Sequence, residues 1–180
     1  MIAPMEVPIA PKYAAPTART PGRYEGLVHF AAALTWEFGP SLATWTVLDV
    51  GGADGWLGEM LRTRGYAWVD PRATGRGLVG LGEALPISDA AVDLVVSKQT
   101  LPHFTDPVQA CREMCRVARH AVVIRQDWGY RDTAGGYLPI GWPGHSRSQI
   151  DRPADILDAL SVPGWAAAYD DLDFIARRTL

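Results

Sequence analysis

Residues 47–55, VLDVGGADG, join a short apolar run to a turn rich in glycine. The β-branched and apolar residues before the turn predict a buried strand. Small residues in the turn let a ligand approach the backbone, and a helix that starts behind the turn presents free N–H groups. The pattern therefore predicts a ligand-binding turn. Because dinucleotide-binding folds also have such a turn, the surrounding sequence must identify the ligand.

Predicted strands and helices alternate on both sides of this turn. Apolar residues at helical spacing predict a helix over 23–38, and Gly39-Pro40 ends it. Asp106 as N-cap and Pro107 at the first helical position predict a helix that runs to about residue 119. The other predicted elements are strands over 45–50, 66–69, 78–81, 91–97 and 121–125, helices over 56–64 and 154–160, and a C-terminal hairpin over 165–179. This alternation predicts an α/β fold with a mostly parallel sheet.

Length and composition favour one soluble domain. A chain of 180 residues predicts a single core, with an N-terminal arm over 1–21 and one domain over 22–180. The net charge of −3 provides no positive field for nucleic acid. No apolar run reaches the ~18 residues that span a bilayer, and no signal peptide is recognised, so a cytoplasmic location is expected. Cys111 and Cys115 are predicted to pack as reduced apolar residues, and no metal site is predicted.

Residues 126–152 contain several aromatic residues and glycines without a helix or strand period. Long irregular segments inside domains are commonly functional, so this segment is predicted to be the loop that binds the substrate. The aromatic residues could line an acceptor pocket or form a small core beneath the loop, and the sequence leaves both readings open. The aromatic residues of this segment are Trp128, Tyr130, Tyr137 and Trp142.

Four segments in order resemble the class I S-adenosylmethionine-dependent methyltransferases. Residues 47–55 are similar to motif I of that family, and GEALPISDAAVDLVVS (82–97), LPHFTDP (101–107) and EMCRVAR (113–119) resemble its later motifs. The likeness covers about residues 46–125 and is strongest to the branch that acts mostly on small molecules. It implies a Rossmann-like sheet in the order 3-2-1-4-5-7-6 with an antiparallel C-terminal hairpin strand, helices on both faces, and S-adenosyl-L-methionine as cofactor.

The resemblance also implies roles for the residues of motif I. The backbone of Gly51 and Gly52 is expected to face the amino-acid end of the cofactor, and Gly55 is expected to let the following helix pack closely. Asp49 is expected to face the cofactor's ammonium group. Asp70, at the end of the second strand, is expected to accept hydrogen bonds from the ribose hydroxyls, because a carboxylate has two acceptor oxygens. A turn with Pro71 is the structural alternative for Asp70.

The adenine side departs from the family pattern. Many members have an aspartate after the third strand, where this chain has Leu81. Adenine contacts are therefore expected from backbone groups around Leu81 and Gly82 or from Glu83, and Ser97 is also predicted to contact the cofactor. Residues 71–80 are too few for the helix usually found there.

His103 and His145 are the candidate catalytic residues. Methyl transfer requires a base only if the acceptor is protonated at the working pH, and an imidazole titrates in that range. His103 follows the fourth strand, where such sheets bind ligands, and His145 lies within the predicted acceptor loop. The predicted function is methyl transfer to an O or N centre of a small or medium-sized acceptor. A methyltransferase-like binding or scaffold protein without turnover and a nicotinamide-dependent oxidoreductase are the alternatives.

Overall fold

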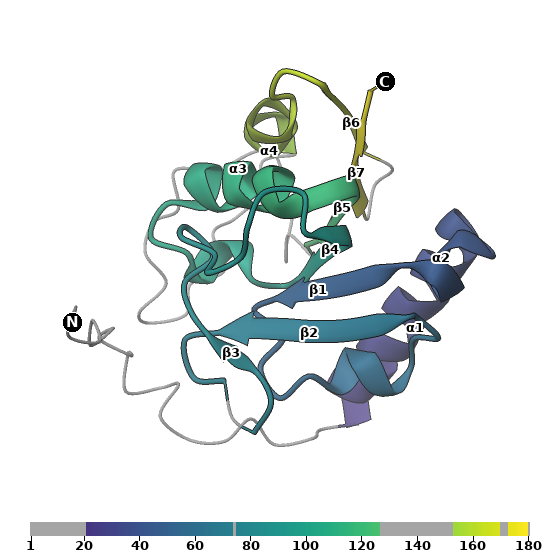
Figure 1. The fold of residues 1–180 in the computed structure, drawn as a ribbon. Helices are drawn as coiled ribbons and strands as arrows, with labels where there is room; N and C mark the ends of the chain where they lie inside the picture. Colours follow the sequence, from purple (N-terminus) through teal and green to yellow (C-terminus); the bar gives the residue numbers. More distant parts are fainter. Residues whose placement is uncertain (1–20, 74, 127–152, 170–172, 180) are drawn as a thin grey trace, which may run out of the picture.

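The computed structural model describes residues 21–73, 75–126, 153–169 and 173–179, and these form a seven-stranded sheet (Figure 1). The strand order is β3-β2-β1-β4-β5-β7-β6, which confirms the predicted order. Neighbouring strands from β3 to β5 are parallel, whereas β7 is antiparallel to both β5 and β6. The strands are β1 (Thr46–Val50), β2 (Gly65–Asp70), β3 (Leu78–Val79), β4 (Val92–Lys98), β5 (Ala118–Arg125), β6 (Trp165–Tyr169) and β7 (Asp173–Arg178).

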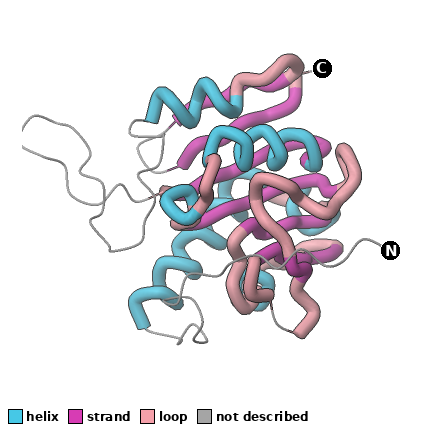
Figure 2. The backbone as a smooth tube through the Cα atoms, turned by 90° about the vertical axis from the view of Figure 1, so that its left-hand side faces the viewer, coloured by secondary structure: helices cyan, strands magenta, loops and turns pink. Residues whose placement is uncertain are grey.

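Helices cover both faces of this sheet, as predicted (Figure 1, Figure 2). Side chains alternate between the faces along each strand, so each strand contributes to two separate cores. In β1, Val47 packs in the core that contains Phe30 of α1, whereas Leu48 packs in the core that contains Met114 of α3. One face carries α1 (Pro21–Phe38) and α2 (Ser41–Thr44), and the other carries α3 (Pro107–Val117) and α4 (Pro153–Leu160).

The prediction of a helix over 56–64 is wrong. Only one 3₁₀ turn, η2 (Trp56–Glu59), follows the glycine turn. The side chains of β2 fill the space beside this segment: a Cβ on Gly58 would overlap the ring of Tyr66, and a Cβ on Gly55 would lie 2.7 Å from Cε3 of Trp68. The two rings are 6.2 Å apart and lie on the same face of β2. The rings of Tyr66 and Trp68 therefore occupy the space that a longer helix would need.

The boundaries of the other helices and strands match the predicted ones or differ from them by a few residues. Strand β5 begins at Ala118, three residues before the predicted start at 121 and one residue after α3 ends. The cap of α3 is confirmed: Asp106 Oδ1 accepts a hydrogen bond of 2.9 Å from the N–H of Gln109. Both cysteines are free and buried, as predicted, and burial raises the pKa of each thiol to about 12. The predicted acceptor loop beyond Gln126 and the N-terminal arm up to residue 20 lie outside the described residues.

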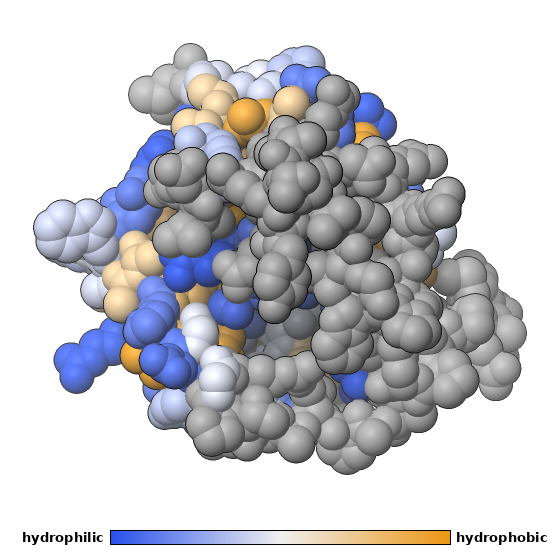
Figure 3. Space-filling view, turned by 180° about the vertical axis from the view of Figure 1, so that it is seen from behind, coloured by the Kyte–Doolittle hydropathy of each residue, from blue (hydrophilic) through white to orange (hydrophobic). Residues whose placement is uncertain are grey.

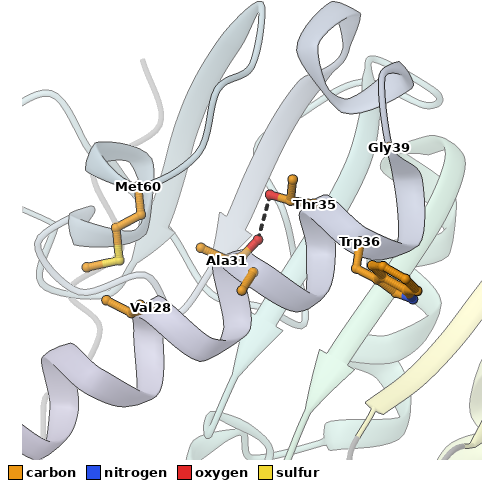
Figure 4. Close-up of a pocket in the computed structure, with 7 residues that line it drawn as sticks. Val28, Ala31, Thr35, Trp36, Gly39 and Met60 are labelled. Atoms are coloured by element: carbon orange, nitrogen blue, oxygen red, sulfur yellow. Dashed lines mark hydrogen bonds between the residues drawn. The ribbon is translucent and has the colours of Figure 1, made fainter.

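The outer face of α1 is unusually apolar for an exposed helix. Trp36 is 90% exposed, and hydrophobic residues lie among polar ones on that side of the molecule (left-hand side of Figure 3). A groove of about 660 Å³ runs along the helix, and no charged side chain lines it (Figure 4). Its lining residues are Val28, Ala31, Ala32, Thr35, Trp36, Gly39 and Met60. None of them is a predicted cofactor residue. Among the described residues, no helix is both long and apolar enough to cross a membrane.

Candidate cofactor site

The turn after β1 has the geometry that the motif requires. Gly51 has φ of 79° and Gly55 has φ of 73°, a left-handed conformation that side chains disfavour. The N–H of Gly51 donates a hydrogen bond of 2.7 Å to the carbonyl of Val69, which fixes the turn against β2. A Cβ on Gly51 would overlap the methyl group of Thr100, which follows β4. The turn is therefore held between the carboxyl ends of β2 and β4.

Asp49 lies directly beneath this turn. Its side chain is buried, with 5% of the residue exposed, and its Oδ2 accepts a hydrogen bond of 2.7 Å from the hydroxyl of Tyr66. Burial raises the pKa of Asp49 to about 6, and the Tyr66 hydrogen bond opposes that rise. The negative charge of Asp70 raises this pKa further, and the positive charge of Lys98 lowers it. A buried acid that is ionised at neutral pH favours a cationic group nearby.

The absence of a side chain at Gly52 determines how closely the turn approaches Asp49. A Cβ on Gly52 would lie 2.8 Å from Asp49 Oδ2 and 2.8 Å from Cβ of Trp68. Any other residue at position 52 would therefore clash with the Asp49 carboxylate and with Trp68. The glycine lets the backbone of the turn lie directly against that carboxylate.

Asp70 ends β2 beside the same turn. Its Oδ2 accepts a hydrogen bond of 3.2 Å from the N–H of Ala53, and its Oδ1 accepts one of 2.9 Å from the N–H of Arg72. The guanidinium Nε of Arg72 lies 3.5 Å from Oδ1. Asp70 thus has the turn role that the sequence left open. An ionised carboxylate offers about four lone-pair sites, so these contacts leave capacity for a diol.

Ser97 is fully buried, and its hydroxyl is already bonded within the protein. Ser97 Oγ donates a hydrogen bond of 2.9 Å to the carbonyl of Val50 and is also bonded to Oγ1 of Thr100. These bonds join the carboxyl ends of β1 and β4 beneath the turn. The structure assigns Ser97 a supporting position, and its predicted contact with the cofactor stays a prediction.

The residues expected to bind adenine support the start of α3. Glu83 Oε1 accepts hydrogen bonds of 2.6 Å from the N–H of Thr105 and 3.2 Å from the N–H of Asp106. A Cβ on Gly82 would overlap the ring of Phe104, and Leu81 pairs with Ala84 in an isolated bridge. The segment that connects β3 to β4 is therefore fastened to the region between β4 and α3.

A second clamp fastens the same segment from within α3. Glu113 Oε2 accepts a hydrogen bond of 2.9 Å from the N–H of Leu85, and Arg116 donates to Glu113 and to the carbonyl of Ile87. The hydrogen bond from Arg116 lowers the pKa of Glu113. Because these contacts join residues of 82–97 to residues of 113–119, they give those two motifs a structural reason to occur together.

His103 is exposed on η3 (Leu101–His103), just beyond β4, and its N–H donates a hydrogen bond of 2.8 Å to the carbonyl of Thr100. The structure thus places it at the carboxyl edge of the sheet with Thr100 and the glycine turn. His145 lies outside the described residues. Within the described ranges, no three His, Cys, Asp or Glu side chains are grouped so that they could hold a metal ion.

Gln99 is a site residue that the sequence did not indicate. It follows β4 with φ of 59°, a conformation that costs a non-glycine residue of order 1 kcal/mol or more. Its N–H donates a hydrogen bond of 2.9 Å to the carbonyl of Arg125, and its Oε1 accepts one of 2.9 Å from Nε2 of Gln126. Gln126 is the first residue of the predicted acceptor loop, so this loop leaves the sheet at the candidate site.

Tyr66 and Thr100 were also missed. For Tyr66 a signal was present: residues 66, 68 and 70 alternate along one strand, so Tyr66 had to lie on the same face as Asp70. For Thr100 the sequence offered no comparable signal, because its contact with Gly51 depends on how two distant loops meet.

Comparison with known proteins agrees with this geometry. Residues 48–124 match the model of a methyltransferase domain family. Over 87 residues the chain is 37% identical to an uncharacterized methyltransferase of Mycobacterium sp. (strain JLS), a match that covers 41% of this chain and 34% of the relative. Over 96 residues it is 33% identical to an uncharacterized methyltransferase of Mycobacterium ulcerans (strain Agy99), covering 45% of this chain and 38% of the relative. The chain thus spans about a third of the length of these curated relatives.

Solved structures share the fold at lower identity. A SAM-dependent methyltransferase from Aquifex aeolicus superposes with a TM-score of 0.55 at 18% identity, covering 89% of this chain and 98% of that protein. The [4+2]-cyclase SpnF superposes with a TM-score of 0.58 at 18% identity, covering 79% of this chain and 58% of that protein. The strand order, the glycine turn with its acids and the family match agree with one another. Residues 48–124 therefore match a methyltransferase domain family, and the described sheet has the fold of these solved structures.

Proposed function

We propose that this protein is an S-adenosylmethionine-dependent methyltransferase that acts on an O or N centre of a small or medium-sized acceptor. One observation carries the proposal: the buried carboxylates of Asp49 and Asp70 flank the same glycine turn. A ligand there would need a cationic end near Asp49 and hydroxyl donors near Asp70. S-adenosylmethionine has an ammonium group and a ribose diol, and its charges do not suit the uncharged groove on α1.

The bound cofactor would supply an electrophilic methyl group on a sulfonium centre. The protein's own residues then have mainly to bind and orient the two reactants. The backbone of Gly51 and Gly52 and the carboxylate of Asp49 would hold the amino-acid end. Asp70 would hold the ribose, while its existing bonds to Ala53 and Arg72 keep its carboxylate in place.

Removal of the Asp70 carboxylate is expected to weaken binding of S-adenosylhomocysteine by about 1–3 kcal/mol, because the ribose would lose a charged acceptor. The Asp70→Ala variant is compared with wild type by calorimetry, well below the melting temperature of both. Asp158→Ala is the matched control, because it removes an exposed carboxylate from α4. Equal affinity of the Asp70 variant and wild type would leave Asp70 with its turn role alone.

His103 would accept a proton from the acceptor, or orient the acceptor by a hydrogen bond. The His103→Asn variant is expected to lose roughly 10²-fold in turnover with little change in melting temperature, since His103 is exposed. Turnover of wild type should also fall below about pH 6.5, the ordinary pKa of an imidazole. Transfer of labelled methyl groups from S-adenosylmethionine to a small-molecule extract measures the turnover of the variant and the turnover of wild type at each pH. A variant that melts several degrees lower and turns over normally would show a structural histidine.

The second candidate is a binding or scaffold protein of the same fold that does not transfer methyl groups. Two observations favour it: Leu81 stands where many family members have an adenine-binding aspartate, and residues 71–73 and 75–80 form no helix. A structural neighbour of similar fold is described as a [4+2]-cyclase. Binding of S-adenosylhomocysteine without methyl transfer to any extract component would support this candidate over the enzyme.

A further inference from the structure

The hydroxyl of Tyr66 is directed at Asp49, a buried acid beneath the glycine turn. Tyr66 donates its hydrogen bond to Asp49 Oδ2 at 2.7 Å, and its ring packs against the position of Gly58. Tyr66 is held protonated, because burial and the adjacent negative charge of Asp49 raise its pKa far above the usual range. Tyr66 therefore acts as a hydrogen-bond donor to Asp49.

Among the neighbouring groups, the Tyr66 hydroxyl does most to favour the ionised form of Asp49. The groups that face the carboxylate are Tyr66 and Asp70 from β2 and Lys98 from β4. Of the two that favour ionisation, Tyr66 has the larger effect on the pKa of Asp49, and Lys98 has the smaller. The oxygen that accepts from Tyr66, Oδ2, also lies against the backbone of Gly52, since a Cβ there would be 2.8 Å from it.

We infer that Tyr66 is a positioning residue for the cofactor: its hydroxyl keeps the Asp49 carboxylate ionised and oriented, so that an ammonium-bearing ligand binds much more tightly when Asp49 is ionised. This inference rests on the proposed function, because it assigns the ammonium group of S-adenosylmethionine to Asp49. It adds a dependence of cofactor affinity on pH. Since Asp49 titrates with a pKa of about 6, affinity is fully present above that pH and falls as the pH decreases through it.

The expected result in wild type is a loss of affinity for S-adenosylhomocysteine by roughly tenfold between about pH 7.5 and pH 5, one decade per pH unit below the pKa. Removal of the hydroxyl in Tyr66→Phe should raise the pKa of Asp49 by about one unit, because a hydrogen bond to the charged form is lost. The variant should then bind less than about twofold more weakly than wild type at pH 7.5 but roughly tenfold more weakly at pH 5. Phenylalanine keeps the ring that packs against Gly58.

Two controls assign the effect to Asp49. In Asp49→Asn the affinity should be lower than in wild type and should not change over this pH range, because the amide does not titrate there. 5′-Methylthioadenosine lacks the ammonium and carboxylate groups, so its affinity for wild type should not change with pH.

Isothermal calorimetry with both ligands at about pH 5, 6 and 7.5 gives the test, with a thermal melt of each variant at each pH. An equal loss of affinity in Tyr66→Phe at every pH would overturn the inference and leave Tyr66 a packing role. Binding of S-adenosylhomocysteine to wild type without pH dependence would overturn it while leaving the proposed function intact. No binding by wild type at any of these pH values would contradict the proposed function itself, and the inference with it.

Discussion

Replacement of Gly51 by alanine is expected to lower the free energy of unfolding by roughly 2–5 kcal/mol and to prevent cofactor binding. Two costs add at this position. The backbone has φ of 79°, where an L-residue costs about 1–2 kcal/mol more than glycine. The new Cβ would also overlap Cγ2 of Thr100, and such overpacking costs about 1–3 kcal/mol. Urea unfolding of the variant and wild type measures the sum.

Two further variants separate these costs. Gly164 has φ of 83° with nothing within 4 Å of its Cβ position, so Gly164→Ala should show the conformational cost alone. Thr100→Ser removes the clashing methyl group and keeps the hydroxyl that bonds to Ser97, so it should recover the overpacking cost when combined with Gly51→Ala. If Gly51→Ala unfolds no more readily than Gly164→Ala, the contact between the glycine turn and Thr100 is unimportant.

The order of the strands was expected from the resemblance of the ordered motifs to a known family, whereas the individual elements were predicted from local patterns. Residues 94–96 of β4 are an apolar run, and the cap of α3 combines Asp106 with Pro107 in adjacent positions. The helix predicted over 56–64 could not be excluded in the same way. Its sequence permits a helix, and the reason it stops after η2 is the pair of rings that β2 places beside it. Helix propensity is a property of the local sequence and takes no account of side chains from a neighbouring strand.

In the candidate site, too, some features could be expected from the sequence and others could not. The positions of Asp49, Gly51 and Asp70 could be expected because the motif places them at or near strand ends, and parallel strands bring those ends to one edge, while their roles toward a cofactor stay predictions. The partners of these residues could not be predicted. The bond between Tyr66 and Asp49 and the overlap of Thr100 with Gly51 join segments that are distant in sequence. Glu83 was predicted as an adenine contact from its position alone, whereas its bonds to the start of α3 depend on how that loop folds back.

Outside the candidate cofactor site, a buried ion pair holds the carboxyl edge of the sheet. Arg125 of β5 donates from Nε to Oδ1 of Asp173 at 2.7 Å and from Nη2 to Oδ2, and these two residues are register partners in β5 and β7. Arg125 is 9% exposed and Asp173 is 6% exposed. The guanidinium Cζ also lies 5.0 Å from the ring centre of Phe30, so the pair connects both strands to α1.

Asp173→Ala is expected to destabilise the protein by about 3–5 kcal/mol, because Arg125 would remain charged and buried without its bidentate partner. The double variant Arg125→Met, Asp173→Leu should recover most of this loss, since apolar residues can replace a buried pair at little cost. Asp89→Ala is the control, because it removes the 79% exposed partner of Arg116 and should cost less than about 1 kcal/mol.

The same substitution should also affect the site. The carbonyl of Arg125 accepts the N–H of Gln99, whose left-handed backbone costs free energy and so depends on its surroundings. Loosening of β5 in Asp173→Ala should therefore increase amide hydrogen exchange at Gln99, while the N–H of Gly51, bonded to Val69 on the other side of β1, stays protected. Uniform exchange at both positions would mean that the ion pair supports the whole fold. Selective exchange at Gln99 would mean that the ion pair supports in particular the end of β5, where the predicted acceptor loop begins.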